Sequence, residues 1–399
     1  MNSKNSIILL LVIICQIIIL PGCWDRRELN ELSIVSAVGI ELAEQEEELT
    51  YIFQIINPSA ITGKGIGGMK VPFVVESCEG KTIFEVSAKA NTILPRELYY
   101  DHLQVFIISY NYAKEKGIAE ILDGFYRNHE VRENILVLIS YDSKTENVLS
   151  TLTTLENING IYIKNILNNS YKNASTTKPI ELREIVNTLS SETKSLVVPL
   201  IDVSETEDLS SISLAQSTNR EATIKIAGLA VFKKDKVIGT LDHLETLALN
   251  CINDKLKKAI CVVSYKGGNN SIELVNSKTK IKADFKNGQP QISIDVKHRA
   301  NINEINVAID LSDPKVIKDL EKEVDEKINM EIRKLIKKAQ KELNLDIFGF
   351  GEALRRENPK EWEKIKTDWE SYFVDLKVEI KVNTTIQEVE MKNKTFLKN

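Results

Sequence analysis

The sequence has few of the residues from which catalytic and metal sites are usually built. Its 399 residues include four histidines and five cysteines, with no C-x-x-C pair and no two histidines spaced as i and i+4. The patterns G-x-S-x-G, H-E-x-x-H and the P-loop are also missing. We therefore expect no catalytic residue, no metal, no cofactor and no enzymatic activity.

Long apolar runs and an excess of positive charge are missing as well. After residue 22 no apolar stretch approaches the roughly 20 residues that span a bilayer, which excludes a polytopic membrane protein. The 52 Lys and Arg against 57 Asp and Glu give a formal net charge of −5, which argues against a nucleic-acid partner. A hydrophobic content of 43% is enough to form real cores and excludes a disordered chain.

The amino-terminus has the pattern of a secretory leader followed by a lipid attachment site. Lys4 precedes an apolar stretch over residues 7–20, and Leu20-Pro21-Gly22-Cys23 resembles a bacterial lipobox. The pattern predicts a signal peptide over residues 1–22 and lipidation of Cys23, which would carry two or three acyl chains such as palmitate. The alternatives are an uncleaved apolar anchor or a chance cysteine after a generic leader.

The other cysteines do not form a disulfide framework. With Cys15 in the leader and Cys23 on lipid, Cys78, Cys251 and Cys261 remain, an odd number. Buried free thiols are the interpretation that we favour, and a Cys251–Cys261 bridge is the alternative.

Strands and helices alternate along the chain, which predicts a mixed α/β (α+β) fold. A polar stretch over 168–178 predicts a loop, and an acidic stretch over 204–222 predicts a linker between an N-terminal region (23–203) and a C-terminal region (223–399). The expected elements of the first region are strands 32–42, 49–57, 103–109 and 135–140 with helices 81–94 and 112–126. Those of the second are a hairpin over 223–241, a helix over 244–258, a long helix over 314–343 and strands around 292–297 and 376–382.

The long helix carries a narrow apolar stripe. Val316, Leu320, Val324 and Ile328 begin a series spaced by three or four residues, and Asp313-Pro314 predicts its start. We expect the stripe to pack on the protein's own sheet, and a partner-binding face is the alternative.

Two further patterns have a structural explanation. The glycines Gly63, Gly65 and Gly68 match G-x-G-x-x-G, but a strand-like segment with Pro72 follows instead of a helix, so a loop is expected rather than a dinucleotide site. His102 precedes a buried strand, where we expect a hydrogen-bonded core residue.

Several segments together resemble the Ger(x)C family, the lipoprotein C subunits of spore nutrient germinant receptors. The matching segments are Cys23 to Leu29, His102 to Val105, Phe125 to Arg132, Gly228 to Lys233, Asp346 to Gly351 and Asn358 to Trp362 with Trp369. In the last two, Gly349 and Gly351 suit the end of the long helix, and Asn358-Pro359 suits a helix start. That start would place Trp362 and Trp369 on one helical face.

The resemblance implies a three-domain lipoprotein in which each domain is a mixed sheet with packed helices. It also implies a non-catalytic role in nutrient-triggered germination, with the receptor's A and B membrane subunits as partners. The protein would be anchored through Cys23 at the outer face of the spore inner membrane. A solute-binding lipoprotein of a transporter and a cell-wall hydrolase are the alternatives.

Overall fold

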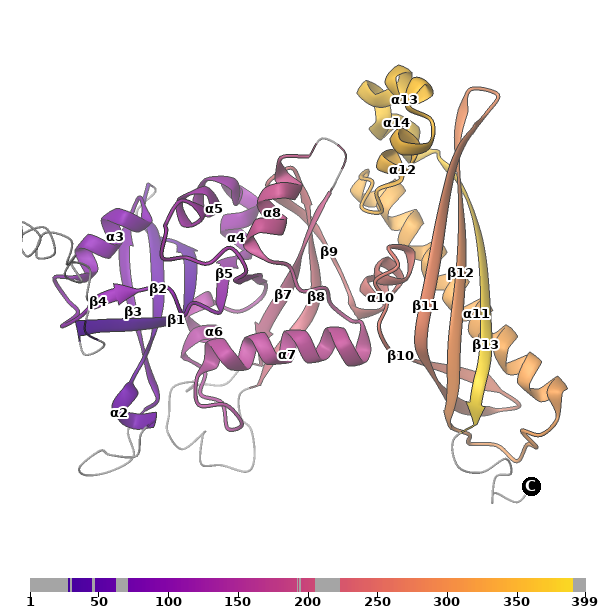
Figure 1. Ribbon diagram of the computed structural model, residues 1–399, viewed down its shortest axis with the longest axis horizontal. Coiled ribbons are helices and arrows are strands. Elements are labelled where there is room, and N and C mark those ends of the chain that lie inside the picture. Colours follow the sequence, from indigo (N-terminus) through magenta and orange to yellow (C-terminus); the bar gives the residue numbers. More distant parts are fainter. Residues whose placement is uncertain are drawn as a thin grey trace, which may run out of the picture.

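The computed structural model describes residues 28, 31–44, 47–61, 71–191, 193, 195–204 and 223–389. These residues form two sheets that lie at opposite ends of the long axis in Figure 1, with helices packed against both. The mixed α+β fold that the alternating pattern predicted is confirmed.

The first sheet has the strand order β3-β2-β1-β5-β6-β7-β8-β9, and β4 pairs with β1. Its central strands run parallel and are continuously apolar, because helices cover both faces, while the strands toward each edge are antiparallel. The strands are β1 (Leu32–Leu42), β2 (Leu49–Ile56), β3 (Phe73–Gly80), β4 (Glu97–Tyr99), β5 (Val105–Ser109), β6 (Leu136–Ser140), β7 (Leu196–Val203), β8 (Ile224–Lys233) and β9 (Lys236–Leu241).

Two apolar cores sit on the two faces of this sheet. One face packs against α3 (Ile83–Ala90), α4 (Tyr110–Glu115), α5 (Ala119–Tyr126) and α8 (Leu182–Leu189), and the other against α6 (Thr145–Ser150) and α7 (Asn159–Ala174). A short helix, α2 (Pro58–Ile61), follows β2.

The loop expected over 168–178 is wrong for its first part. Helix α7 continues through this asparagine-rich stretch to Ala174, and the chain leaves it at Ser175 with φ 51°. Tyr162, Ile163 and Leu167 bury one side of the helix against the sheet. That packing outweighs the weak helix propensity of the polar residues on the other side.

The single helix expected over 112–126 is two helices, α4 and α5. The break lies at Gly117 and Ile118, where the Ile118 N–H donates to the carbonyl of Asp235 in the β8–β9 turn. The helix expected over 244–258 is likewise shorter, because α10 (His243–Ile252) ends at Asn253.

The second sheet has the order β10-β11-β12-β13. Long antiparallel strands β11 and β12 meet at a tight turn, and β13 joins β12 in parallel. The strands are β10 (Ala259–Tyr265), β11 (Gly268–Lys286), β12 (Gln289–Glu304) and β13 (Lys377–Val389).

Helix α11 (Pro314–Lys338) lies along this sheet, capped by the Asp313 side chain, which accepts from the Lys315 N–H. Its apolar stripe is buried in the core of the second sheet, as expected. A π-helical turn, η2 (Ala339–Leu343), extends it, and Asn344 ends it with φ 49°. The glycine cap expected here is therefore wrong: Gly349, with φ 76°, precedes α12 (Phe350–Glu357) instead, and Gly351 lies within that helix.

The first sheet continues past residues 205–222 into the C-terminal part of the chain, because β8 pairs with β7. Strand β8 contributes to the cores of both sheets: Ala230 and Phe232 belong to one of the two cores of the first sheet, and Ile224 and Ile226 belong to the other. Leu229 and Val231 belong to the core of the second sheet. The division at 204–222 and the count of three domains remain predictions, and apart from Ser204 that stretch lies outside the described residues.

Candidate functional site

A buried carboxylate organises the segment that follows the long helix. The Asp346 side chain accepts hydrogen bonds from the N–H groups of Phe348, Gly349 and Gly351 at 2.8–3.0 Å, and from the Trp369 indole at 3.3 Å. Burial raises the pKa of the Asp346 carboxyl, and the donors oppose that rise. An aspartate that accepts from the N–H two residues later is typical of an Asx-turn. The segment from Asp346 to Gly349 therefore indicates such a turn, which the sequence analysis did not predict.

The same segment is held against the first sheet. The Ser195 hydroxyl donates to the Asp346 carbonyl at 2.7 Å, and the Thr193 hydroxyl donates to the Glu352 carboxylate at 2.6 Å. Lys233, at the end of β8, forms an ion pair with Glu370 at 2.9 Å. These contacts join residues more than 130 positions apart, and so fix the end of α11 relative to β7 and β8.

A cavity of about 310 Å³ lies where these segments meet. Thr188 lines it from helix α8, Ser195 from just before β7, Lys234 from the β8–β9 turn, and Trp362 and Trp369 from the C-terminal helices. Hydroxyl, ammonium and indole groups are therefore available there, but the described residues contain no group of three or more His, Cys, Asp or Glu side chains that could hold a metal ion.

The two tryptophans do not share one helix, so that expectation is wrong. Trp362 lies in helix α13 (Pro359–Ile365), a 3-10 turn η3 (Lys366–Asp368) follows, and Trp369 begins α14 (Trp369–Val374). Their rings still meet edge to face with centroids 5.4 Å apart. A side chain at Gly351 would approach both rings to within 3 Å, so the glycine allows this contact. Pro359 begins α13 as expected, but the Asn358 side chain donates to the Ala283 carbonyl instead of capping.

Strand β9 meets the end of the long helix at Gly239, where a Cβ would lie 2.7 Å from the Leu343 side chain. Lys338 reaches back from α11 to the Thr240 carbonyl at 2.9 Å and to Glu245 at 2.7 Å. These contacts fix the β8–β9 hairpin against α10 and the end of α11.

Comparison with known proteins identifies this arrangement. A profile described as "Spore germination protein N-terminal domain" matches residues 25–203, and one described as "Spore germination B3/ GerAC like, C-terminal" matches residues 227–390. The chain belongs to this GerAC-like spore germination family. The expected family is confirmed.

Relatives of the family match along nearly their whole length. Spore germination protein KC of Bacillus subtilis (strain 168) is 29% identical, with 97% of this chain and 96% of that protein covered. Spore germination protein B3 of the same organism is 24% identical over 92% of this chain and 95% of that protein. The crystal structure of the GerBC protein has the same fold, with a TM-score of 0.57 at 19% identity, covering 91% of this chain and 99% of that chain.

Most matched family segments have structural roles. Gln104 links three elements: its N–H donates to the Ser36 carbonyl, its carbonyl accepts from the Leu136 N–H, and its side chain accepts from Lys164 at 2.9 Å. Phe125 packs on Phe106 with ring centroids 4.3 Å apart.

Arg132 forms a two-bond pair with Asp101 at 2.9 Å. His129 and His102 are both exposed, so the core position expected for His102 is wrong; its ring instead meets Tyr99 edge to face.

The predicted lipid site is not part of the described structure. The predicted leader over 1–22, Cys23, the rest of the match over 23–29 apart from Glu28, and the glycine pattern over 63–68 lie outside the described residues. Among the helices that are described, none has the length and apolar character to cross a membrane.

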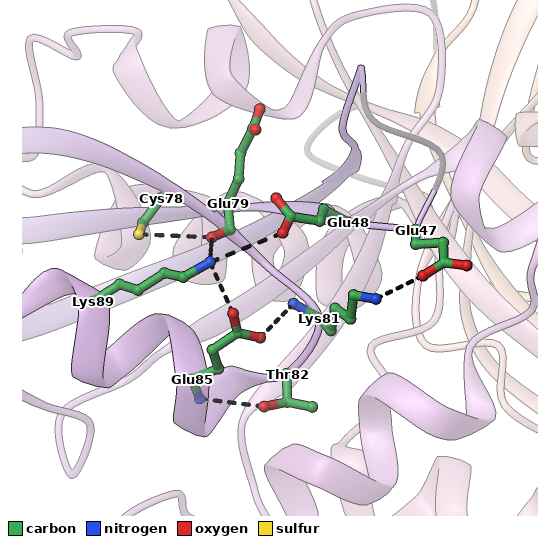
Figure 2. Close-up of polar contacts among 8 residues, drawn as sticks. All are labelled: Glu47, Glu48, Cys78, Glu79, Lys81, Thr82, Glu85 and Lys89. Carbon is green, nitrogen blue, oxygen red and sulfur yellow. Dashed lines mark hydrogen bonds and ion pairs between the residues drawn. The ribbon is translucent and has the colours of Figure 1, made fainter.

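The three remaining cysteines are free thiols. Burial raises the pKa of the Cys251 thiol to about 12 and that of Cys261 to about 11, so both stay protonated at neutral pH. Burial also raises the pKa of Cys78, which Figure 2 shows beside the Glu79 carbonyl. The thiols therefore lack the thiolate character of a nucleophile.

The acidic residues around Cys78 are paired with lysines. In Figure 2, Lys89 of α3 points to Glu85 and the Glu79 carbonyl, at 2.8 and 3.0 Å, and Lys81 lies 2.6 Å from Glu47. The side chains are exposed, so each pair contributes little stability. The cluster fastens α3 to β3 and the β2 end of the sheet.

A buried histidine should make stability depend on pH. His298 is 2% exposed, its Nε2 is 3.7 Å from the Cys251 Sγ, and desolvation lowers its pKa to about 4. Because the folded pKa lies below the unfolded value, the stabilisation is present above about pH 6.5 and is lost as pH falls toward 4, by up to about 3 kcal/mol. Urea unfolding across this range measures the slope.

His298→Gln should flatten that slope, while His129→Gln, at an exposed position, should leave it unchanged. Equal slopes for the wild type and His298→Gln would contradict the assignment.

Proposed function

We propose that this chain is the lipid-anchored C subunit of a spore nutrient germinant receptor. It would be held at the outer face of the spore inner membrane through Cys23, and would assemble there with the receptor's A and B membrane subunits. The observation that supports this most directly is the pair of family matches over 25–203 and 227–390, which begin two residues after the predicted lipid site.

A short tether would keep the folded body at the membrane. The nine residues from Cys23 to Glu31 can extend to about 32 Å at most, and β1 begins at the next residue, Leu32. Confinement near the bilayer raises the effective concentration of partners in the same membrane, so individual contacts with them can be weak.

The role proposed is one of contact, without catalysis. Among the most buried ionisable side chains, Asp346 accepts hydrogen bonds from backbone N–H groups. His298 and Cys251 are buried and serve packing. A peptidoglycan digestion assay with the purified chain tests the hydrolase alternative, and release of wall fragments would support that alternative.

A transporter-type binding protein is less well supported by the architecture. Such a protein would need two doubly wound lobes that close about a hinge. Here the second sheet is an antiparallel ribbon with one parallel edge strand, and β8 contributes to both cores, so closing motion would disturb buried contacts. Titration calorimetry against germinants tests this alternative.

Cys23→Ala should weaken both membrane retention and nutrient-triggered germination. Each acyl CH₂ buried in the bilayer contributes about 0.8 kcal/mol, so loss of the acyl chains removes most of the anchoring free energy. Mass spectrometry of the N-terminus, membrane fractionation and a germination assay measure the effect.

Cys15→Ala, which removes a thiol from the predicted leader, is the matched control and should behave as the wild type. An unmodified Cys23 in the wild type, or unchanged retention and germination in Cys23→Ala, would overturn the anchor. Co-purification of a tagged chain from detergent-solubilised spore membranes tests the assembly with the A and B subunits.

A further inference from the structure

The second sheet has one covered and one open face. Alternate residues of β12, such as Ile292, Ile294 and Val296, point into the core beneath α11 and are buried. The residues between them point the opposite way, and with their neighbours on β11 and β13 most are exposed. The sheet therefore presents an exposed polar surface on the side away from α11.

Positive charge gathers on one half of this open face. Register places Lys280 and Lys381 on either side of Asp295, Lys278 beside Lys297, and Arg299 between Asn276 and Thr385. We call the five cations the basic patch: Lys278, Lys280, Lys297, Arg299 and Lys381. Asp295 is the single acidic residue among these three rows, so the rows carry a net charge of +4.

The stability of the fold does not explain why these five cations lie together. Residues opposite one another on antiparallel strands have Cβ atoms about 4.5–5.5 Å apart, and like charges there are unfavourable. Lys278 and Lys297 are such a pair. Within the described part of the chain, none of the five cations has an ion-pair partner.

The other half of the same face is balanced. Lys282 and Glu379 flank Ser293, and Asp284 and Lys377 flank Gln291. These two rows carry two positive and two negative charges, so the excess is local to the basic patch and is not a property of the whole sheet.

The charge and side-chain chemistry of the face fit anionic lipid headgroups. The described residues on this face include no aromatic side chain, whereas the cores of protein interfaces are enriched in aromatic anchors. Two aliphatic residues of β10, Ile260 and Val262, are 50% and 41% exposed, and they lie opposite Glu273 and Ser271 of β11, beyond the Arg299 row. We infer that the basic patch binds the anionic phospholipid surface of a membrane.

Lysine footprinting of the full chain tests this inference. The chain is reconstituted into vesicles of phosphatidylcholine alone or with phosphatidylglycerol, and acetylation by a lysine-reactive ester is followed by mass spectrometry. Lys278, Lys280, Lys297 and Lys381 should be labelled several-fold more slowly on the anionic vesicles. Lys322, an exposed residue of α11 behind the sheet, should be labelled equally on both.

A pair of matched variants isolates the patch. The double substitution Lys278→Gln with Lys297→Gln should weaken the binding of the basic patch to the anionic vesicles roughly thirtyfold, since each basic residue near an anionic surface contributes about a factor of five. The protection of Lys280 and Lys381 should then disappear. Lys282→Gln with Lys377→Gln removes the same charge from the balanced half and should preserve it. Because all four residues are exposed, neither variant should unfold below the wild-type temperature.

Equal labelling on the two vesicles, or equal effects of the two variants, would overturn the inference and leave an acidic protein surface as the occupant. The inference rests on the proposed function only for the nearness of a membrane. Protected lysines with an unmodified Cys23 would overturn the tether alone, and unprotected lysines with a lipidated Cys23 would overturn the patch alone.

Discussion

Replacing Asp346 with alanine is expected to lower the free energy of unfolding by about 3–5 kcal/mol. The carboxylate accepts from three backbone N–H groups and from the Trp369 indole, and it is buried. Each donor left without an acceptor in such a place costs about 1–3 kcal/mol. Urea unfolding measures the loss, and the tryptophan emission of the folded variant should change because the indole loses its partner.

Asp375→Ala is the control for this substitution. Asp375 follows α14, but its side chain is 84% exposed and pairs with Lys341 at the surface. Its removal should change stability by less than about 0.5 kcal/mol. If Asp346→Ala cost no more than Asp375→Ala, the carboxylate would not be the centre of the turn.

Gly228→Ala is expected to cost about 4 kcal/mol or more, and so to prevent stable folding at ordinary growth temperatures. Gly228 has φ 113°, and an added Cβ would lie 2.0 Å from the Leu241 carbonyl oxygen. The position of the Cβ is fixed by the β8 backbone and the oxygen belongs to the β9 backbone, so neither can move aside without breaking the pairing of the hairpin.

Gly267→Ala separates conformational strain from steric overlap. Gly267 also has positive φ, at 84°, but nothing lies within 4 Å of the added Cβ. It should cost only the strain of the left-handed conformation, about 1–2 kcal/mol. Equal losses in the two variants, compared by urea unfolding, would show that the overlap at Gly228 is relieved by movement of the strands.

Local sequence patterns predicted several of the strands and the start of the long helix. The apolar runs at β1, β5 and β6 and the alternation in β12 read directly as strands, and Asp313-Pro314 marked the start of α11. Such features depend on neighbours in sequence, which is why they were visible.

Contacts between distant residues were not predictable in the same way. Helix α7 persists in a polar stretch because it packs on a sheet formed by other segments. The membership of β8 in the first sheet depends on β7, which the sequence interpretation did not single out. The role of Asp346 depends on Ser195 and Trp369, which are far away along the chain.

The position of β8 has a practical consequence for dividing the molecule. The two family matches are separated at residues 204–226, but a cut there would leave β7 with an open edge in one fragment and β8 in the other. Open edges are templates for aggregation or for re-pairing of the two pieces. A cut after Leu241 would keep the sheet whole but would remove Leu229 and Val231 from the second core. We therefore expect that neither half folds stably on its own, and that fragment complementation would suit this protein better than isolated halves.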